Sequence, residues 1–252
     1  MADAEHAENG GHGPLSQFEI KAIGGAEGQE LAFYSFTNSS LMMVIAVMLV
    51  TLTLLGGIRR GALVPSRWQS LAEISYEFIA NMIRDNVGQE GRRYFPFIFT
   101  LFMFVLTGNM LGMVPYSFTF TSHIVVTFLM AAVVFIGVTV IGFMKHGLHF
   151  LHFFLPSGVP MFLAPLLIPI EILSYFTRPV SLALRLFANM TAGHTMLKVF
   201  AGFVAPLGII GGIVPLALVA GLTALEFIIA FLQAYVFTIL SCVYLNDALH
   251  MH

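Results

Sequence analysis

The sequence is poor in cysteine, in tryptophan and in charged residues. Its 252 residues include one cysteine, Cys242, and one tryptophan, Trp68, and only 10% are Asp, Glu, Lys or Arg. A single cysteine excludes an internal disulfide framework and a cysteine-based metal cluster. The formal net charge of −2 excludes a general basic surface, which argues against nucleic acid as a partner.

Hydrophobic residues, in contrast, make up 58% of the chain, and the mean hydropathy is +0.89. An ordinary soluble domain has an apolar share of about 45–50% and a charged share of about 25%. A chain with this composition must dissolve in lipid. We therefore predict an all-α integral membrane protein.

The apolar runs predict five membrane crossings within a single transmembrane domain, residues 36–252. The expected crossings are residues 36–58, 95–114 and 123–144 and two longer helices at residues 159–201 and 209–247. Ser66 and Gln69 have the spacing of a capping box, and helical periodicity follows them. This pattern predicts an amphipathic helix on the membrane surface at residues 66–90.

The last two apolar segments are too long for upright helices. A helix of the 42 residues from Val159 to Phe200 would measure about 63 Å, whereas the hydrocarbon core of a bilayer is about 30 Å thick. A long helix crosses such a layer by tilting. We expect the two segments to form a long tilted hairpin, turning in the glycine-rich stretch 202–212.

Residues 1–35 are expected to form a polar tail. The first thirty contain six carboxylates and one lysine, Lys21, and they lack the cationic and apolar pattern of a signal peptide. Arginines cluster between the first two expected crossings: Arg59, Arg60, Arg67, Arg84, Arg92 and Arg93. The positive-inside rule then places the N-terminus outside and, after five crossings, the C-terminus in the cytoplasm.

The two long segments carry polar residues at helical spacing. An arginine near the middle of a membrane costs from about 3 to more than 10 kcal/mol, so Arg185 needs a partner, water or a purpose. The first segment has a polar stripe of Glu171, Ser174, Arg178, Ser181, Arg185 and Asn189, with His194 and Lys198 on its other side. The second has a stripe of Thr223, Glu226, Gln233 and Tyr244.

Carboxylate, imidazole, hydroxyl and amide groups at membrane depth suit a proton relay. Arginine cannot take part as a relay, because it does not deprotonate in proteins. It can only attract an anion or repel a cation. Two other interpretations stay open: an autonomous ion or solute antiporter that uses the same groups, and a structural scaffold whose charges pair internally.

Neither a metal site nor a cofactor site is expected. His146, His149 and His152 border a membrane interface, without a nearby carboxylate or thiol to complete a coordination shell. The glycine pairs at residues 56–57 and 211–212 lack the strand, lysine and spacing of a phosphate-binding loop. We therefore interpret these glycine pairs as turns.

One stretch carries a specific signature. Residues 181–194 read Ser-Leu-Ala-Leu-Arg-Leu-Phe-Ala-Asn-Met-Thr-Ala-Gly-His. This stretch resembles the signature of the a subunits of F-type ATP synthases, and the resemblance extends from about residue 41 to residue 247. It is supported by Arg93-Tyr-Phe-Pro-Phe, by Asn109 with the sequence up to Pro115, and by Glu226 followed by Gln233.

The resemblance implies a proton-translocating stator subunit that is not itself an ATP-binding enzyme. Such a subunit packs its tilted hairpin against a ring of c subunits, offers two half-channels to the carboxylates of the ring, and works with peripheral-stalk b-type subunits. Arg185 would face the ring carboxylate and block a direct proton leak. Asn189, His194, Glu226 and Gln233 would line the outer inlet, Glu171 and Ser181 the inner exit, with Arg178, Asn109, Thr223 and Tyr244 in support.

The sequence departs from some bacterial members of that family in one respect. Those members carry the acid on the first long helix and the imidazole on the second, whereas here His194 comes first and Glu226 second. Because the two groups face one another in the family, the exchange should preserve a hydrogen-bonded pair. The arrangement resembles the mitochondrial one. We expect a bacterial inner (plasma) membrane protein, and place a mitochondrial inner membrane second.

Overall fold

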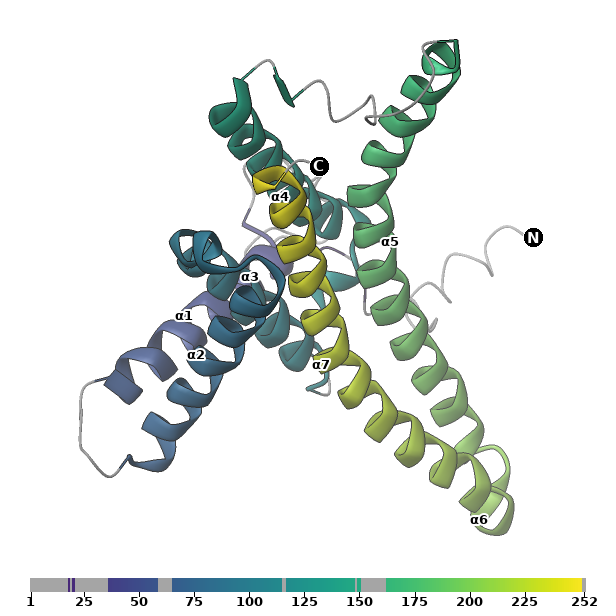
Figure 1. Cartoon of the computed structure of the whole chain (residues 1–252). Coiled ribbons are helices and arrows are strands. Elements are labelled where there is room, and N and C mark those ends of the chain that lie inside the picture. Colours follow the sequence, from purple (N-terminus) through teal and green to yellow (C-terminus); the bar gives the residue numbers. More distant parts are fainter. Residues whose placement is uncertain are drawn as a thin grey trace.

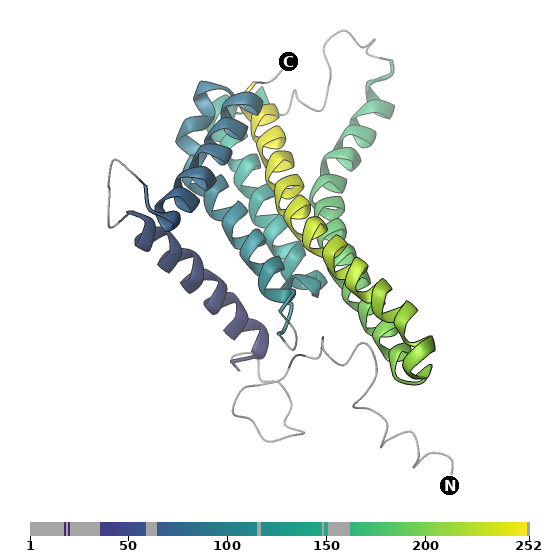
Figure 2. The ribbon, with the colours of Figure 1, turned by 90° about the horizontal axis from the view of Figure 1, so that it is seen from below.

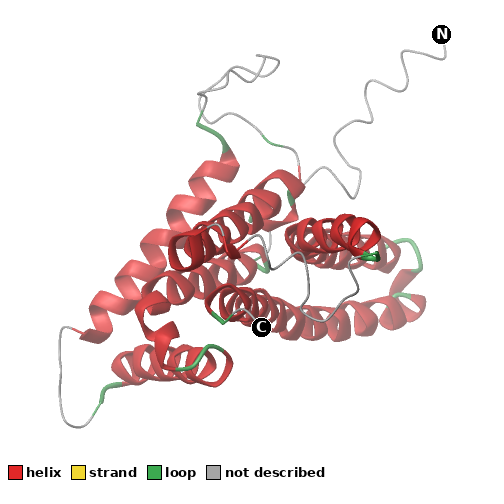
Figure 3. Ribbon diagram, turned by 45° about the horizontal axis from the view of Figure 1, so that its top comes forward, coloured by secondary structure: helices red, strands yellow, loops and turns green. Residues whose placement is uncertain are grey.

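The described part of the structure, a computed structural model, consists of residues 36–58, 65–114, 117–147, 149–150 and 162–250, with residues 18 and 20. The rest of the expected N-terminal tail, together with Arg59, Arg60 and His152, lies outside the described residues. The described elements are helices (Figures 1 and 3). They are α1 (Asn38–Ile58), α2 (Arg67–Asn86), η2 (Gln89–Tyr94), α3 (Phe95–Gly112), η3 (Phe120–Ser122), α4 (Ile124–His146), α5 (Ala164–Val204), α6 (Gly208–Gly211) and α7 (Ile213–Leu249).

Five of these helices are long and apolar enough to cross a membrane: α1, α3 with η2, α4, α5 and α7. This confirms the predicted fold class. The helices α5 and α7 contain 41 and 37 residues, which correspond to about 60 and 55 Å at 1.5 Å per residue. They are joined through α6 and form the expected long hairpin, whose turn projects beyond the other helices (Figure 2).

The helix α2 is amphipathic. Its start is capped, because the Ser66 side chain accepts a hydrogen bond from the backbone N–H of Gln69. One face buries Ile79, Met82 and Ile83. The helix ends at Asn86 instead of the expected residue 90, and Gly88 follows with φ of 79°, a conformation that glycine adopts at little cost.

The core lies where α2, α3, α4, α5 and α7 meet. Small side chains at its centre let the helix backbones approach closely: Ala131, Ala183, Ala230 and Ala234 are all buried. Large buried side chains fill the remaining space, among them Phe102, Leu186, Met190 and Phe237. Long apolar side chains cover the outward faces of α1, α4, α5 and α7, as expected where lipid or another membrane subunit is the neighbour.

The α3–α4 connection packs onto the second half of α5. A Cβ atom at Gly108 would lie 2.4 Å from Phe120 Cζ, and one at Gly112 would lie 2.7 Å from Thr119 Oγ1. Because Gly108 and Gly112 have no side chains, η3 and Thr119 can pack directly against α3. As a result, the connection reaches the α5–α7 hairpin.

Candidate functional site

A buried acid–imidazole pair joins α5 to α7. Nδ1 of His194 lies 2.5 Å from Oε1 of Glu226, and the two side chains are only 11% and 4% exposed. The two residues are on neighbouring antiparallel helices, so the hairpin itself creates the pair. The same hairpin places Gly193 beside Glu226, and a Cβ atom there would lie 2.6 Å from Glu226 Oε1. The absence of a side chain at Gly193 is what lets the carboxylate approach α5.

The imidazole of His194 has acceptors at both nitrogens. Nε2 lies 2.9 Å from the carbonyl oxygen of Gly112, and Nδ1 lies 3.0 Å from that of Met190 as well as near Glu226. A doubly protonated imidazole can donate at both positions. Thr119 Oγ1, 3.3 Å from Nε2, adds a hydroxyl at the same end. The site can therefore hold a proton on the imidazole and a negative charge on the carboxylate.

A second polar contact lies closer to the centre of the hairpin. Nδ2 of Asn189 donates to Oε1 of Gln233 at 2.9 Å. The Gln233 side chain is buried, and its Nε2 has no partner among the described residues. On the neighbouring helix α3, Asn109 Nδ2 donates to the carbonyl oxygen of Ala230 at 3.1 Å. A buried donor without a protein partner, such as Gln233 Nε2, can bind and orient water.

Arg185 lies one turn before Asn189 on α5 and is exposed. Within the described part of the chain it forms no hydrogen bond and no ion pair. Its neighbours Leu182 and Leu186 are buried, so the helix presents its apolar side to the core. The guanidinium is thus left available to a partner outside this chain.

Arg178, two turns earlier, is in a different environment. Its Nη1 donates to Oδ2 of Asp247 at 2.8 Å, and its guanidinium carbon lies 5.3 Å from the centroid of the Tyr244 ring. Tyr175, whose hydroxyl lies 2.7 Å from Thr139 Oγ1, has its ring centroid 5.7 Å from the same carbon. Arg178 is therefore neutralised within the chain.

Three predicted residues are not drawn into these contacts. Glu171 is half-buried and Ser181 is exposed, and neither contacts the His194–Glu226 pair. Thr223 is half-buried, and its hydroxyl donates to the carbonyl oxygen of Val219 on its own helix at 2.8 Å. Among the described residues there is no group of three or more His, Cys, Asp or Glu placed to hold a metal ion.

Comparison with known proteins gives a family that agrees with this arrangement. The family described as ATP synthase A chain matches residues 40–246. The ATP synthase subunit a of Paramagnetospirillum magneticum is 61% identical over 245 residues, covering 95% of this chain and 99% of the relative. The chain belongs to the ATP synthase A chain family. This confirms the resemblance seen in residues 181–194.

Other A chains are similar over the same length. The ATP synthase subunit a of Rhodospirillum rubrum is 59% identical over 241 residues, covering 96% of this chain and all of the relative. That of Pelagibacter ubique is 56% identical over 239 residues, covering 95% and 98%. The bacterial relatives, together with the five long apolar helices of this chain, support a multi-pass bacterial membrane protein.

Sequence reasoning missed several residues that this A chain places at the site. Asp247 follows Tyr244 by three residues on the same helix face, a spacing that could have suggested it. Gly193 lies inside the signature stretch, but the sequence does not indicate that a side chain there would meet Glu226. Thr119 lies in a connection without periodicity, so only the folded chain reveals its contact with His194.

Gly193 offers a test of the close approach in this A chain. If the pair transfers protons as the sequence predicts, Gly193→Ala should force Glu226 away from His194 and lower ATP-driven proton pumping by about tenfold or more, because misplacement by about 1 Å can cost up to about a hundredfold. Pumping in membrane vesicles measures it. Gly202→Ala on the same helix is the matched control, because a Cβ there meets nothing within 4 Å. Equal pumping by both variants would refute the requirement for close approach.

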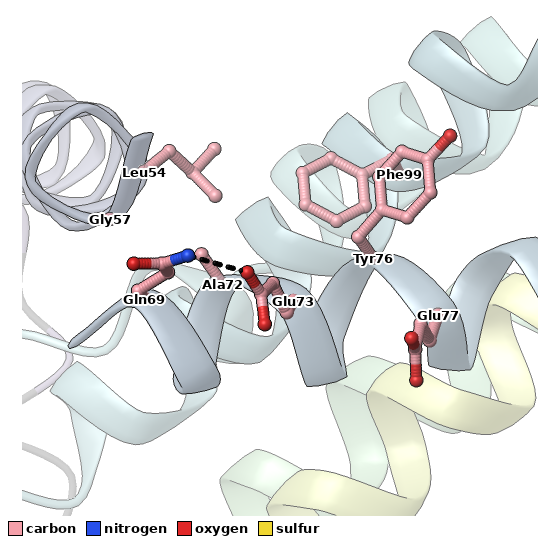
Figure 4. Close-up of a pocket in the computed structure, with 8 residues that line it drawn as sticks. All are labelled: Leu54, Gly57, Gln69, Ala72, Glu73, Tyr76, Glu77 and Phe99. Carbon is pink, nitrogen blue, oxygen red and sulfur yellow. Dashed lines mark hydrogen bonds between the residues drawn. The ribbon is translucent and has the colours of Figure 1, made fainter. Parts of the chain in front are cut away.

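A cavity of about 530 Å³ lies apart from these residues, between α1, α2 and α3. Figure 4 shows Leu54 and Gly57 of α1 at one side of it and Tyr76 beside Phe99 at the other. Its polar contact is a hydrogen bond from Gln69 Nε2 to Glu73 Oε1 at 2.8 Å. The cavity shares no lining residue with the hairpin site of this A chain.

Proposed function

We propose that this chain is the proton-conducting stator subunit of a rotary ATP synthase. It would provide two half-channels to and from the carboxylates of a c ring and so couple proton flow to ring rotation. The observation that carries the proposal is the exposed Arg185, which has no ion-pair partner among the described residues, on the same hairpin as the buried His194–Glu226 pair. Its partners would be the c ring, b-type subunits of a peripheral stalk, and membrane lipid.

The proposed role of Arg185 follows from its charge. An ionised ring carboxylate in lipid is costly, and a nearby cation lowers that cost. Because Arg185 stands on one side of the hairpin, it would do so at one angular position of the ring. It cannot release its own proton, so it also separates the two half-channels.

The inlet would run along the hairpin toward Arg185. The antiparallel helices place His194 opposite Glu226, and next Asn189 opposite Gln233. His194 and Asn189 are nine and four residues from Arg185, which correspond to about 13 and 6 Å along the helix. A titratable pair followed by an amide pair would pass protons in steps, the amides orienting the intervening water.

The exit would use Glu171 and Ser181, on the other side of Arg185 along α5. Glu171 is half-buried and has no ion-pair partner among the described residues, so its carboxylate is available to a proton. We propose a bacterial inner membrane location, with the N-terminus outside and the C-terminus in the cytoplasm. Each proton would then supply about 2.3 kcal/mol per 100 mV of membrane potential.

Reconstitution tests this function directly. Liposomes would contain the chain alone, the c ring alone, or the complete membrane sector, and an imposed potential would drive proton flux read by a pH-sensitive dye. Only liposomes that contain the complete membrane sector should show a proton flux above that of empty liposomes. The half-channels of this chain connect only through the ring, so neither component by itself should conduct. Comparable flux through the chain alone would favour an autonomous transporter and overturn the proposal.

A further inference from the structure

Two arginines lie on one side of α5. Arg178 and Arg185 are seven residues apart, which places them about 10 Å apart along the helix and within about 20° of the same direction. Both carry a permanent positive charge. A mobile anion that passes along this side of the hairpin could in principle be held by either of them.

The two arginines differ in their contacts. The Arg178 and Asp247 side chains, 25% and 34% exposed, form an ion pair at 2.8 Å. The rings of Tyr175 and Tyr244 lie against the same guanidinium, and aromatic faces attract cations. Arg185 is exposed and has no carboxylate partner among the described residues.

We propose that Asp247 is a positioning residue that neutralises Arg178, so that on this side of α5 Arg185 alone presents a net positive charge to the ring. This inference rests on the proposed function. Without Asp247, a ring carboxylate would meet a second net cation along its path. It would then stay ionised beyond Arg185, and its proton exchange would slow.

The expected size of the effect follows from the spacing. Two unit charges about 10 Å apart at an effective dielectric constant of about 20 interact strongly enough to change an equilibrium roughly tenfold. Asp247→Asn should therefore lower ATP-driven proton pumping by about that factor. Asp247→Glu, which keeps the charge, should pump within about twofold of the native rate.

The decisive variant removes both charges. Arg178→Gln combined with Asp247→Asn leaves no net cation at this position, so pumping should return to within about threefold of the native rate. The measurement is ATP-driven proton uptake into vesicles carrying the complete synthase, normalised to the assembled complex. Asp85→Asn, in the exposed Arg84–Asp85 pair of α2, is the matched control and should pump at the native rate.

The outcomes separate this inference from its alternatives. A double variant as slow as Asp247→Asn would overturn it, because a structural clamp, or a proton-carrying role of Asp247, predicts no rescue. Native pumping by Asp247→Asn would overturn it too. If Asp247→Asn fails to assemble, the double variant decides alone: pumping within about threefold of the native rate supports the inference, and slower pumping overturns it.

A parallel Arg185→Ala sample distinguishes failure of the proposed function from failure of the inference about Asp247. If that variant pumps at the native rate, the proposed function fails, whatever the Asp247 variants do. If it does not pump and the double variant also fails to recover, only the inference about Asp247 fails.

Discussion

ATP-driven proton pumping should fall to background when Arg185 is replaced by alanine. In the proposed mechanism this side chain is the one net cation among the described residues on its side of α5, since Arg178 is paired with Asp247 and Lys198 lies on the other side of the helix. Without it, ionisation of the ring carboxylate loses its stabilising partner, and a cost of several kcal/mol in lipid corresponds to a loss of about a thousandfold or more. Proton uptake into vesicles during ATP hydrolysis, and ATP synthesis under an imposed potential, would measure it.

The same variant should lose the barrier between the half-channels. Vesicles stripped of the soluble sector should therefore keep or increase their passive proton leak, while coupled transport is lost. Arg84→Ala is the matched control, because it removes an equal charge from an exposed position on α2 and should leave pumping unchanged. Full coupling in Arg185→Ala would refute the stator mechanism and move an autonomous transporter to first place.

The second large effect is expected at the His194–Glu226 pair. Glu226→Gln removes the titratable acid and should lower ATP-driven pumping by about a hundredfold, the usual contribution of a positioned proton-transfer group. The amide can still fill the space, so assembly should be preserved. A native rate in Glu226→Gln would instead support a scaffold whose charges only hold the hairpin together. Glu77→Gln, on the surface of α2, is the control.

Exchanging the two groups tests the pair as a unit. His194→Glu alone would bury two carboxylates together, and Glu226→His alone would bury two imidazoles, so each should pump poorly. The double exchange restores one acid and one imidazole across the same helix contact. It should recover at least about a third of native pumping, since interacting residues are strongly non-additive. A double exchange no better than either single variant would contradict the idea that pairing matters more than order.

Much of the fold could be predicted because a bilayer leaves few choices. Apolar runs of sufficient length must become helices, and five of the described helices are long and apolar enough to cross. The ends of the helices were predicted less accurately than their existence. The run toward residue 90 gave no sign that Gly88 would end α2 early with a positive φ. The first long helix begins at Ala164, while residues 159–161 lie outside the described part.

The sequence predicted that His194 and Glu226 form a hydrogen-bonded pair, and the folded hairpin brings these two side chains together. The contacts of the other candidate residues were not predicted, and the functional roles of all of them stay predictions. Helical spacing placed Arg178 and Arg185 on one stripe, and it did not indicate which of the two is paired with a carboxylate. Only the folded hairpin distinguishes them, because Asp247 lies 69 positions away in the chain. The same holds for Gly112 and Thr119, which reach His194 from the α3–α4 connection.

The sequence by itself determined that the chain is helical, that it suits a membrane, which family it resembles and which side chains could carry protons. These properties depend on composition, on local periodicity and on a continuous signature. The tertiary structure decided that Asp247 pairs with Arg178, that Gly112 and Thr119 reach His194, and that Arg185 has no ion-pair partner among the described residues. Such outcomes depend on the relative register of two helices and on gaps left by residues such as Gly193, and neither is encoded in any one segment.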